Sequence, residues 1–142
     1  MQPTETSAEA VKRVEALVQE AFAQLPAGAT LKFSDGSDHG SCDDAESGLP
    51  RGRVFVEKRY NVVPRAGGGW PEEQAIPALV AFWEKQGYRV YDDGRDRRDP
   101  KFVVDTPDGY AVIVHGYDRG DHYDFTLSGS SPCVWENGTP EP

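Results

Sequence analysis

Alternating apolar and polar residues run through the second half of this 142-residue chain, and they constrain its fold more than any other feature. Two such runs, 102–106 and 110–117, are separated by the Pro-Asp-Gly segment 107–109. Proline sets the first angle of a tight turn and glycine takes the left-handed position, so the segment predicts a β-hairpin. A three-residue turn places Val104 opposite Val112.

A second hairpin follows, with its turn at 118–121. Counting outward from this turn, we expect Tyr117 opposite His122 and His115 opposite Asp124. Side chains alternate between the two faces of a strand, so a register slip of one residue would exchange the faces. The two hairpins agree on one assignment of faces, and this agreement supports the sheet.

The apolar face of the predicted sheet must be the one that helices cover. We assign to it Phe102, Val104, Tyr110, Val112, Val114, Tyr123, Phe125 and Leu127. The opposite face then carries Asp105, Ile113, His115, Tyr117, His122, Asp124 and Thr126.

Two amphipathic helices are predicted. The first spans 7–24, with Ser7 as its N-cap. The second begins at Pro71, where a proline and two following acids suit a first turn, and Gly87 ends it as a C-terminal cap. Apolar residues recur at three- and four-residue steps in the second helix, at Ile76, Leu79, Val80 and Trp83.

Shorter apolar runs at 31–33, 54–63 and 88–91 predict further strands, and the acidic, glycine-rich segment between the first two predicts a long loop. The expected fold is therefore α+β, with two layers: two helices packed on one face of an antiparallel sheet of about five strands. We expect a single domain over residues 7–135. The N-terminal tail 1–6 and the C-terminal tail 136–142 are predicted to be disordered or loose.

The net charge of −9 argues against nucleic-acid binding, because a phosphate backbone would be repelled by most of the surface. No apolar run approaches the roughly 18 residues that a membrane span requires. The sequence contains no recognisable catalytic motif, and we expect no cofactor, no bound metal and a monomer.

The two cysteines, Cys42 and Cys133, both lie in polar segments. Buried structural thiols normally lie in apolar runs, so we interpret the pair as a disulfide that joins the C-terminal segment to the first half. A disulfide indicates an oxidising compartment. Two unrelated exposed thiols remain the alternative.

The segment Ser131-Pro132-Cys133-Val134-Trp135, followed by Gly-Thr-Pro at 138–140, resembles the C-terminal ending of small actinobacterial cell-envelope lipoproteins, the LppA-like group. The patterns at residues 83–88 and 106–110 also resemble those of this lipoprotein group. The resemblance implies an exported, lipid-anchored domain with a disulfide and no assigned activity. The first residues show no signal peptide and no cysteine for acylation, so we expect the chain to be a mature fragment.

The candidate site is the outer sheet face at His115, Tyr117, His122 and Asp124. Two histidines and a carboxylate can bind zinc, and a His–Asp pair can orient a general base. A polar face with a stabilising cross-strand pair explains the same residues without any chemistry. Aromatic residues near the ends of elements form an alternative groove for a sugar or peptide: Trp70, Tyr91, Tyr117 and Trp135.

The sequence therefore supports three hypotheses. The first is an exported, lipid-anchored envelope module that binds a protein or cell-wall component through its open sheet face, without catalysis. The second is a small metal-dependent or hydrolytic enzyme that uses His115, His122 and Asp124. The third is a cytoplasmic immunity or regulatory protein, and a Cys42–Cys133 disulfide in native protein would exclude it.

Overall fold

A computed structural model of the chain describes residues 4–25, 28–42, 52–64, 72–120 and 123–139. Trp70, His122 and most of the loop between 42 and 52 lie outside the described residues, so the predictions that concern them are not addressed by the structure. No helix within the described ranges is long and apolar enough to span a membrane.

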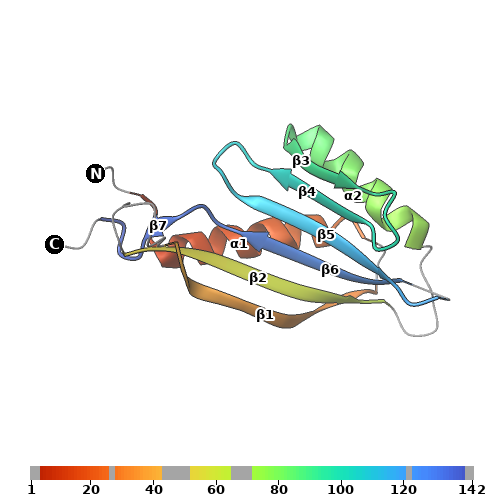
Figure 1. Cartoon of the computed structure of the whole chain (residues 1–142), viewed down its shortest axis with the longest axis horizontal. Helices are drawn as coiled ribbons and strands as arrows, with labels where there is room; N and C mark the ends of the chain where they lie inside the picture. The colour runs from red at the N-terminus through yellow and green to blue at the C-terminus, as the bar shows by residue number, and fades with distance from the viewer. Residues whose placement is uncertain (1–3, 26–27, 43–51, 65–71, 121–122, 140–142) are drawn as a thin grey trace.

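The elements follow one another in a simple order. They are α1 (Ser7–Phe22), β1 (Thr30–Ser41), β2 (Arg53–Val63), α2 (Glu72–Gln86), β3 (Arg89–Gly94), β4 (Lys101–Asp105), β5 (Ala111–Asp118), β6 (Tyr123–Ser130) and β7 (Val134–Trp135). The described strands form one antiparallel sheet with the order β1-β2-β6-β5-β4-β3, and β7 pairs with the start of β2. Both helices lie behind this sheet in Figure 1. The α+β class is confirmed, and the sheet has seven strands, more than the sequence predicted.

The first hairpin has the predicted register, with Phe102 opposite Val114 and Val104 opposite Val112. Its turn is closed by two backbone hydrogen bonds between Thr106 and residues 109 and 110, and Gly109 has a φ of 88°. A positive φ of this size is accessible to glycine at little cost, which is why the Pro-Asp-Gly signal was reliable.

The second hairpin differs from its predicted register by two residues. Tyr117 lies opposite Asp124 and His115 lies opposite Thr126, so the expected pairs with His122 and Asp124 are wrong. The connection begins after Asp118, whose carboxylate accepts a hydrogen bond from the Gly120 amide at 2.8 Å and so starts the turn. A slip of two residues keeps every side chain on its face, which is why the face assignment survives.

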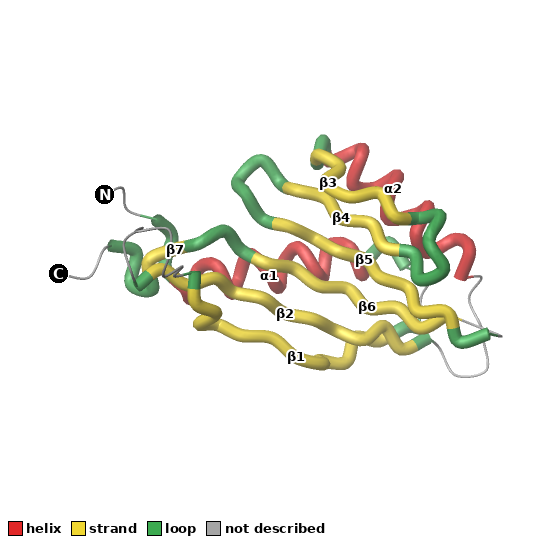
Figure 2. Tube along the Cα trace, viewed as in Figure 1, coloured by secondary structure: helices red, strands yellow, loops and turns green. Residues whose placement is uncertain are grey.

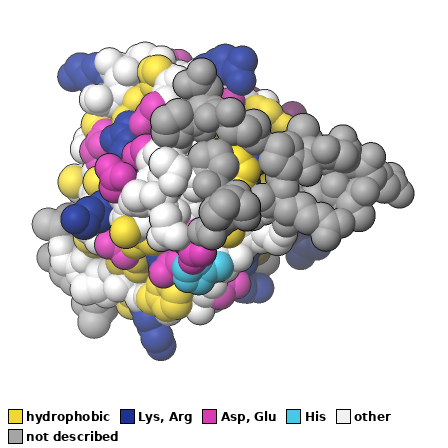
Figure 3. Space-filling view, turned by 90° about the vertical axis from the view of Figure 1, so that its left-hand side faces the viewer, with side chains coloured by type: hydrophobic (Ala, Val, Ile, Leu, Met, Phe, Trp, Pro, Cys, Tyr) yellow, Lys and Arg dark blue, Asp and Glu magenta, His cyan; other side chains and the backbone are white. Residues whose placement is uncertain are grey.

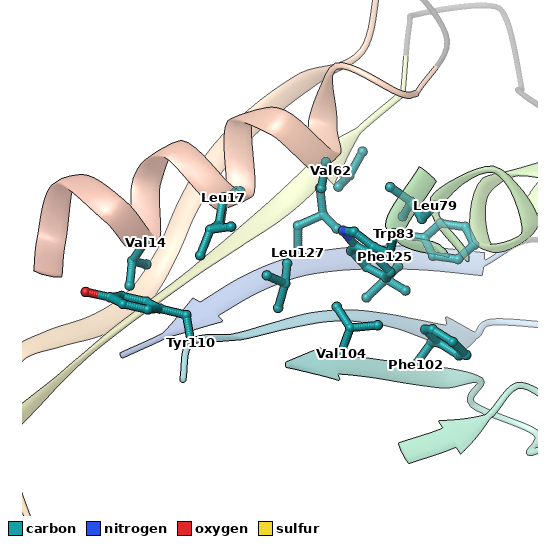
Figure 4. Close-up of a cluster of buried hydrophobic side chains, with 14 of the residues drawn as sticks. Val14, Leu17, Val62, Leu79, Trp83, Phe102, Val104, Tyr110, Phe125 and Leu127 are labelled. Carbon is teal, nitrogen blue, oxygen red and sulfur yellow. The ribbon is translucent and has the colours of Figure 1, made fainter. Parts of the chain in front are cut away.

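The core lies between the sheet and the two helices, and all of the predicted apolar face contributes to it. Figure 4 shows side chains of α1 and α2 pointing toward those of β4, β5 and β6. Trp83 of α2 is 1% exposed and stacks on Phe102 with ring centroids 6.1 Å apart. On the other side of the core, Gly129 faces α1, and a Cβ there would lie 3.2 Å from Val14 Cγ1. The glycine therefore lets the helix approach the sheet closely.

The N-cap of helix α1 lies one residue earlier than predicted. Thr6, not Ser7, is the N-cap: its hydroxyl accepts from the Glu9 amide, and the Glu9 carboxylate accepts from the Thr6 amide. Ser7 is buried and its hydroxyl donates to the Asp38 carbonyl of β1. Helix α2 ends as predicted, with Gly87 at a φ of 77° after its last turn.

Strand β1 continues to Ser41, through a segment that the sequence predicted to be loop. The segment pairs with β2 through two register shifts, between Phe33 and Asp35 and between Ser37 and Gly40. A Cβ at Gly40 would lie 2.5 Å from the Phe55 ring, so the glycine makes the pairing possible. Cross-strand pairing here outweighs the low strand propensity of Asp, Gly and Ser.

The described segments nearest the N- and C-termini lie together at the end of the sheet that carries β7 (Figures 1 and 2). The Thr4 amide donates to the Gly138 carbonyl and the Ser7 amide donates to the Glu136 carbonyl, both at 2.9 Å. The described parts of both predicted tails are thus hydrogen-bonded to one another. The disulfide between Cys42 and Cys133 lies beside them, with the two Cα atoms 6.1 Å apart. The predicted disulfide is present.

Two polar contacts connect the first hairpin with α1 and the N-terminal segment. Arg13 Nε donates to the Asp108 carboxylate at 3.2 Å, and the hydroxyl of buried Tyr110 donates to Glu5 at 2.7 Å. Partial burial raises the pKa of the Asp108 carboxyl, but hydrogen bonds from Thr106 and Arg13 outweigh it and hold the pKa below its usual value.

The lowered pKa of Asp108 predicts a pH dependence of stability. The unfolded chain binds a proton at this carboxyl more readily, so the stabilisation is complete above the ordinary aspartate pKa and is lost as pH falls through the lower folded value. Urea unfolding between pH 6 and pH 3 should therefore show a smaller loss of stability for Asp108→Asn than for the native chain. Equal losses in the two proteins would contradict the assignment.

Candidate binding site on the open sheet face

The sheet face that points away from α1 and α2 is called the open face here. No helix of the described chain covers it, as Figures 1 and 2 show from the front. Its side chains alternate with those of the core along each strand. Across its centre they are Arg59 and Asn61 of β2, Asp124, Thr126 and Ser128 of β6, Ile113, His115 and Tyr117 of β5, and Lys101 and Val103 of β4.

Three of the four predicted site residues are described, and all three point to this face. The His115 and Tyr117 rings lie against each other with centroids 4.3 Å apart. Asp124 receives a hydrogen bond from Arg119 Nε at 2.8 Å. Asp124 lies opposite Tyr117, so the expected His115–Asp124 cross-strand pair is replaced by an aromatic contact and an ion pair. His122, the fourth residue, is not among those described.

Basic side chains surround His115. Partial burial lowers the pKa of its imidazole most, and the charge of Lys101 lowers it further. Asp99 raises the pKa by less than these two effects lower it, and Arg59 and Arg97 each lower it by a smaller amount than Asp99 raises it. Because the pKa of His115 is lowered, its imidazole is mostly neutral at pH 7. Within the ranges that the structure covers, no group of three or more His, Cys, Asp or Glu side chains is arranged to hold a metal ion.

The environment of His115 predicts a measurable titration. Its folded pKa lies below the ordinary histidine value, so protonation disfavours the native state, and stability should decline as pH falls from the ordinary value through the folded one. In an NMR titration, Lys101→Ala should raise the pKa of His115 because one of the repelling charges is removed. An unchanged or lower pKa in that variant would show that Lys101 has no such effect.

A shallow pocket of about 450 Å³ opens on this face, toward the end of the sheet opposite the chain termini. Its lining residues are Ser34, Arg59, Asn61, Tyr117, Arg119, Asp124, Phe125 and Thr126. Tyr117 and Asp124 were predicted as site residues, and the other six were not. The sequence places Arg59 and Asn61 on the polar side of their strand, but only the pairing of β2 with β6 brings them beside Thr126.

Both arginines that line the pocket are ion-paired with a carboxylate. Arg59 Nε lies 3.4 Å from Asp35 on β1, and Arg119 Nε lies 2.8 Å from Asp124 on β6. The guanidinium of Arg119 also lies over the Tyr117 ring, 5.6 Å from its centroid. The irregular pairing of β1 near Ser34 brings this residue into the lining. Each guanidinium group therefore has a carboxylate beside it that offsets part of its charge.

The predicted aromatic groove does not form from the described residues. Trp135 of β7 is 2% exposed, and the Arg53 guanidinium lies 6.0 Å from its ring centroid. Tyr91 is 70% exposed on edge strand β3, and Tyr117 lies in the pocket on another part of the sheet. The fourth member, Trp70, lies outside the described residues.

The surface at the end with the chain termini has a different character. There the His39 imidazole is paired with the Glu136 carboxylate at 2.8 Å, next to the disulfide-linked segment. Figure 3 views this end and shows acidic, basic and apolar side chains interspersed on the described surface. The described surface at this end presents no large region of a single charge. The pocket on the open face is therefore a stronger candidate for a binding site than this end of the molecule.

Comparison of the chain with models of protein families, with curated proteins and with solved structures found no match in any of the three.

Proposed function

We propose that this chain is an extracytoplasmic, envelope-associated module that binds a cell-wall component on its open face, without catalysis. The observation that carries the proposal is the uneven covering of the sheet. Both helices pack on one face, while no helix of the described residues covers the other face, which contains a polar pocket. Concave surfaces on rigid scaffolds are the usual place for ligand binding.

The disulfide supports the proposed compartment. Disulfides persist mainly in oxidising environments outside the cytoplasm. The Cys42–Cys133 bond joins segments 91 positions apart and lies at the end of the molecule where both termini meet. An oxidising compartment is thus consistent with this bond and with the resemblance of the C-terminal segment to lipoproteins of the envelope.

The position of the N-terminal segment supports a tethered arrangement. Thr4 is hydrogen-bonded to Gly138 and Trp135 at the end of the sheet that carries β7. The pocket lies toward the opposite end, where the connection between β5 and β6 is found. A lipid anchor placed before the N-terminal segment would leave the pocket on the side of the sheet, toward the end farther from the membrane.

The charges of the pocket favour binding over catalysis. The Asp124 carboxylate is engaged by Arg119, and the His115 ring packs on Tyr117 and has Thr126 opposite it. A general base would need a free carboxylate or an oriented imidazole close to the substrate. A set of ion-paired, fixed groups is better suited to recognition.

The proposal is tested by sedimentation with purified cell-wall sacculi from an actinobacterium, with their polysaccharides still attached. We expect the native chain to sediment with this material and Asn61→Ala to sediment several-fold less. Lys12→Ala serves as the control, because Lys12 is exposed on α1 on the other side of the molecule. If the native chain stays in solution, or if Lys12→Ala weakens sedimentation as much as Asn61→Ala, the proposed function is wrong.

A separate measurement addresses the compartment. In protein isolated from its native host under conditions that block free thiols, mass spectrometry should find the peptide pair joined through Cys42 and Cys133. The two thiols in reduced form, together with protection from protease in intact cells, would place the chain in the cytoplasm and contradict the proposal.

A further inference from the structure

The pocket on the open face is lined by two arginines and one aspartate, although the chain as a whole has a net charge of −9. Its two guanidinium groups, Arg59 and Arg119, are each paired with one carboxylate, Asp35 and Asp124. An anionic ligand in this pocket therefore meets arginines whose charges are partly offset by neighbouring carboxylates, so it gains less than it would beside unpaired arginines.

The remaining lining groups are hydrogen-bonding groups without charge. Asn61 offers an amide that both donates and accepts, and Ser34, Thr126 and Tyr117 offer hydroxyls that do the same. Among the described lining residues Phe125 is the one with an apolar side chain, and that side chain belongs to the core on the other face. The pocket therefore suits a ligand that has many groups able to donate and accept hydrogen bonds and little exposed apolar surface.

The aromatic ring in the pocket does not serve as a stacking platform. The His115 ring lies 4.3 Å from the Tyr117 ring by centroids, and the Arg119 guanidinium lies 5.6 Å from the Tyr117 centroid. Side chains of the protein thus already pack on this ring. The groups that remain for contact with a ligand are the polar lining side chains.

An anion is disfavoured for a specific reason. A phosphate or carboxylate that binds either arginine also comes close to the carboxylate paired with it, Asp35 or Asp124, and repulsion from that carboxylate offsets part of the attraction. A hydroxyl group avoids this cost, because it accepts from a guanidinium and donates to the neighbouring carboxylate at the same time.

We propose that this pocket binds an uncharged sugar residue, through hydrogen bonds from its hydroxyls to Asn61, Thr126 and the two Arg–Asp pairs. A sugar ring carries several hydroxyls at fixed spacing, each of which is both donor and acceptor. The volume of about 450 Å³ lies toward the lower end of the range for small-molecule sites, which limits the ligand to one or two rings. The inference rests on the proposed function only for the source of the sugar, a polysaccharide of the cell wall.

The test is an NMR titration of the ¹⁵N-labelled native chain with single probes. The uncharged probes are the methyl glycosides of glucose, galactose, mannose and N-acetylglucosamine, and the charged probes are glucuronate and inorganic phosphate. We expect at least one uncharged glycoside to shift the amide resonances of Asn61, Arg119 and Thr126 in a saturable way. Both charged probes should bind at least several-fold more weakly.

Three variants make the result specific. Asn61→Ala should weaken glycoside binding about tenfold, as expected for the loss of hydrogen bonds from a fixed amide. Thr126→Val removes one hydroxyl at nearly constant volume and should also weaken binding. Arg89→Ala is the matched control: Arg89 forms the same kind of pair with Asp105, at 2.8 Å on the open face, but outside the pocket, so the affinity should not change. The melting temperature of each variant establishes that it is folded.

The inference is overturned if no uncharged glycoside shifts the pocket resonances, if glucuronate or phosphate binds there more tightly, or if Arg89→Ala weakens binding as much as Asn61→Ala. These outcomes are separate from those of the sedimentation experiment. Sedimentation of the chain with sacculi without glycoside binding would reject the sugar pocket and leave the envelope function standing. Glycoside binding without sedimentation would reject the envelope function and leave the sugar pocket standing.

Discussion

Reduction of the Cys42–Cys133 disulfide should lower the free energy of unfolding by about 4 kcal/mol and the melting temperature by roughly 10–15 °C. The bond joins positions 91 residues apart, so it removes much of the conformational freedom of the unfolded chain. It also joins the end of β1 to the segment before β7, where the two chain termini are hydrogen-bonded. Guanidinium unfolding with and without a reductant measures the effect.

The double variant Cys42→Ser with Cys133→Ser separates the bond from the reductant. It should unfold at the same denaturant concentration whether or not reductant is present, and close to the reduced native chain. A variant as stable as the oxidised native chain would show that the disulfide contributes nothing to the fold. In that case the bond would lose its value as an argument for a structural role outside the cytoplasm.

Trp83→Ala should destabilise the fold by about 3–5 kcal/mol, the usual range for removing a large buried aromatic side chain. Trp83 is 1% exposed and lies between α2 and the sheet, stacked on Phe102. Its removal leaves a cavity where α2 packs on β4, and the side chains around it cannot collapse fully into the space. Circular dichroism during urea unfolding measures the loss without depending on tryptophan fluorescence.

Tyr91→Ala is the control for this prediction, because Tyr91 is 70% exposed on edge strand β3 and should change stability by no more than about 0.5 kcal/mol. Similar losses in the two variants would mean that α2 does not depend on Trp83 for its attachment. The expected difference follows from burial alone, since both residues are large aromatics in the same half of the chain.

Local patterns were sufficient to predict much of this fold. The Pro-Asp-Gly turn established the register of the first hairpin, and Gly87 marked the end of α2. The alternation from 102 to 127 assigned the core face correctly even where the register was two residues off. Each of these signals acts over a few residues, so the sequence carries it directly.

Interactions between distant segments were not predictable in the same way. Strand β1 extends to Ser41 because β2 pairs with it and Gly40 accommodates Phe55, whereas the local composition indicated a loop. The pairing of β2 with β6 joins the first half of the chain to the last hairpin, and no local pattern encodes its register.

The candidate site follows from these distant pairings. The sequence by itself determined that His115, Tyr117 and Asp124 point away from the helices, because the side chains of a strand alternate strictly between two faces. Only the tertiary structure decided which residues lie beside them. It replaced the expected His–Asp pair with an Arg119–Asp124 pair and brought Arg59 and Asn61 across from another part of the chain. The physical reason is that the direction of a side chain is a local property of the backbone, whereas its neighbours depend on the register between strands far apart in sequence.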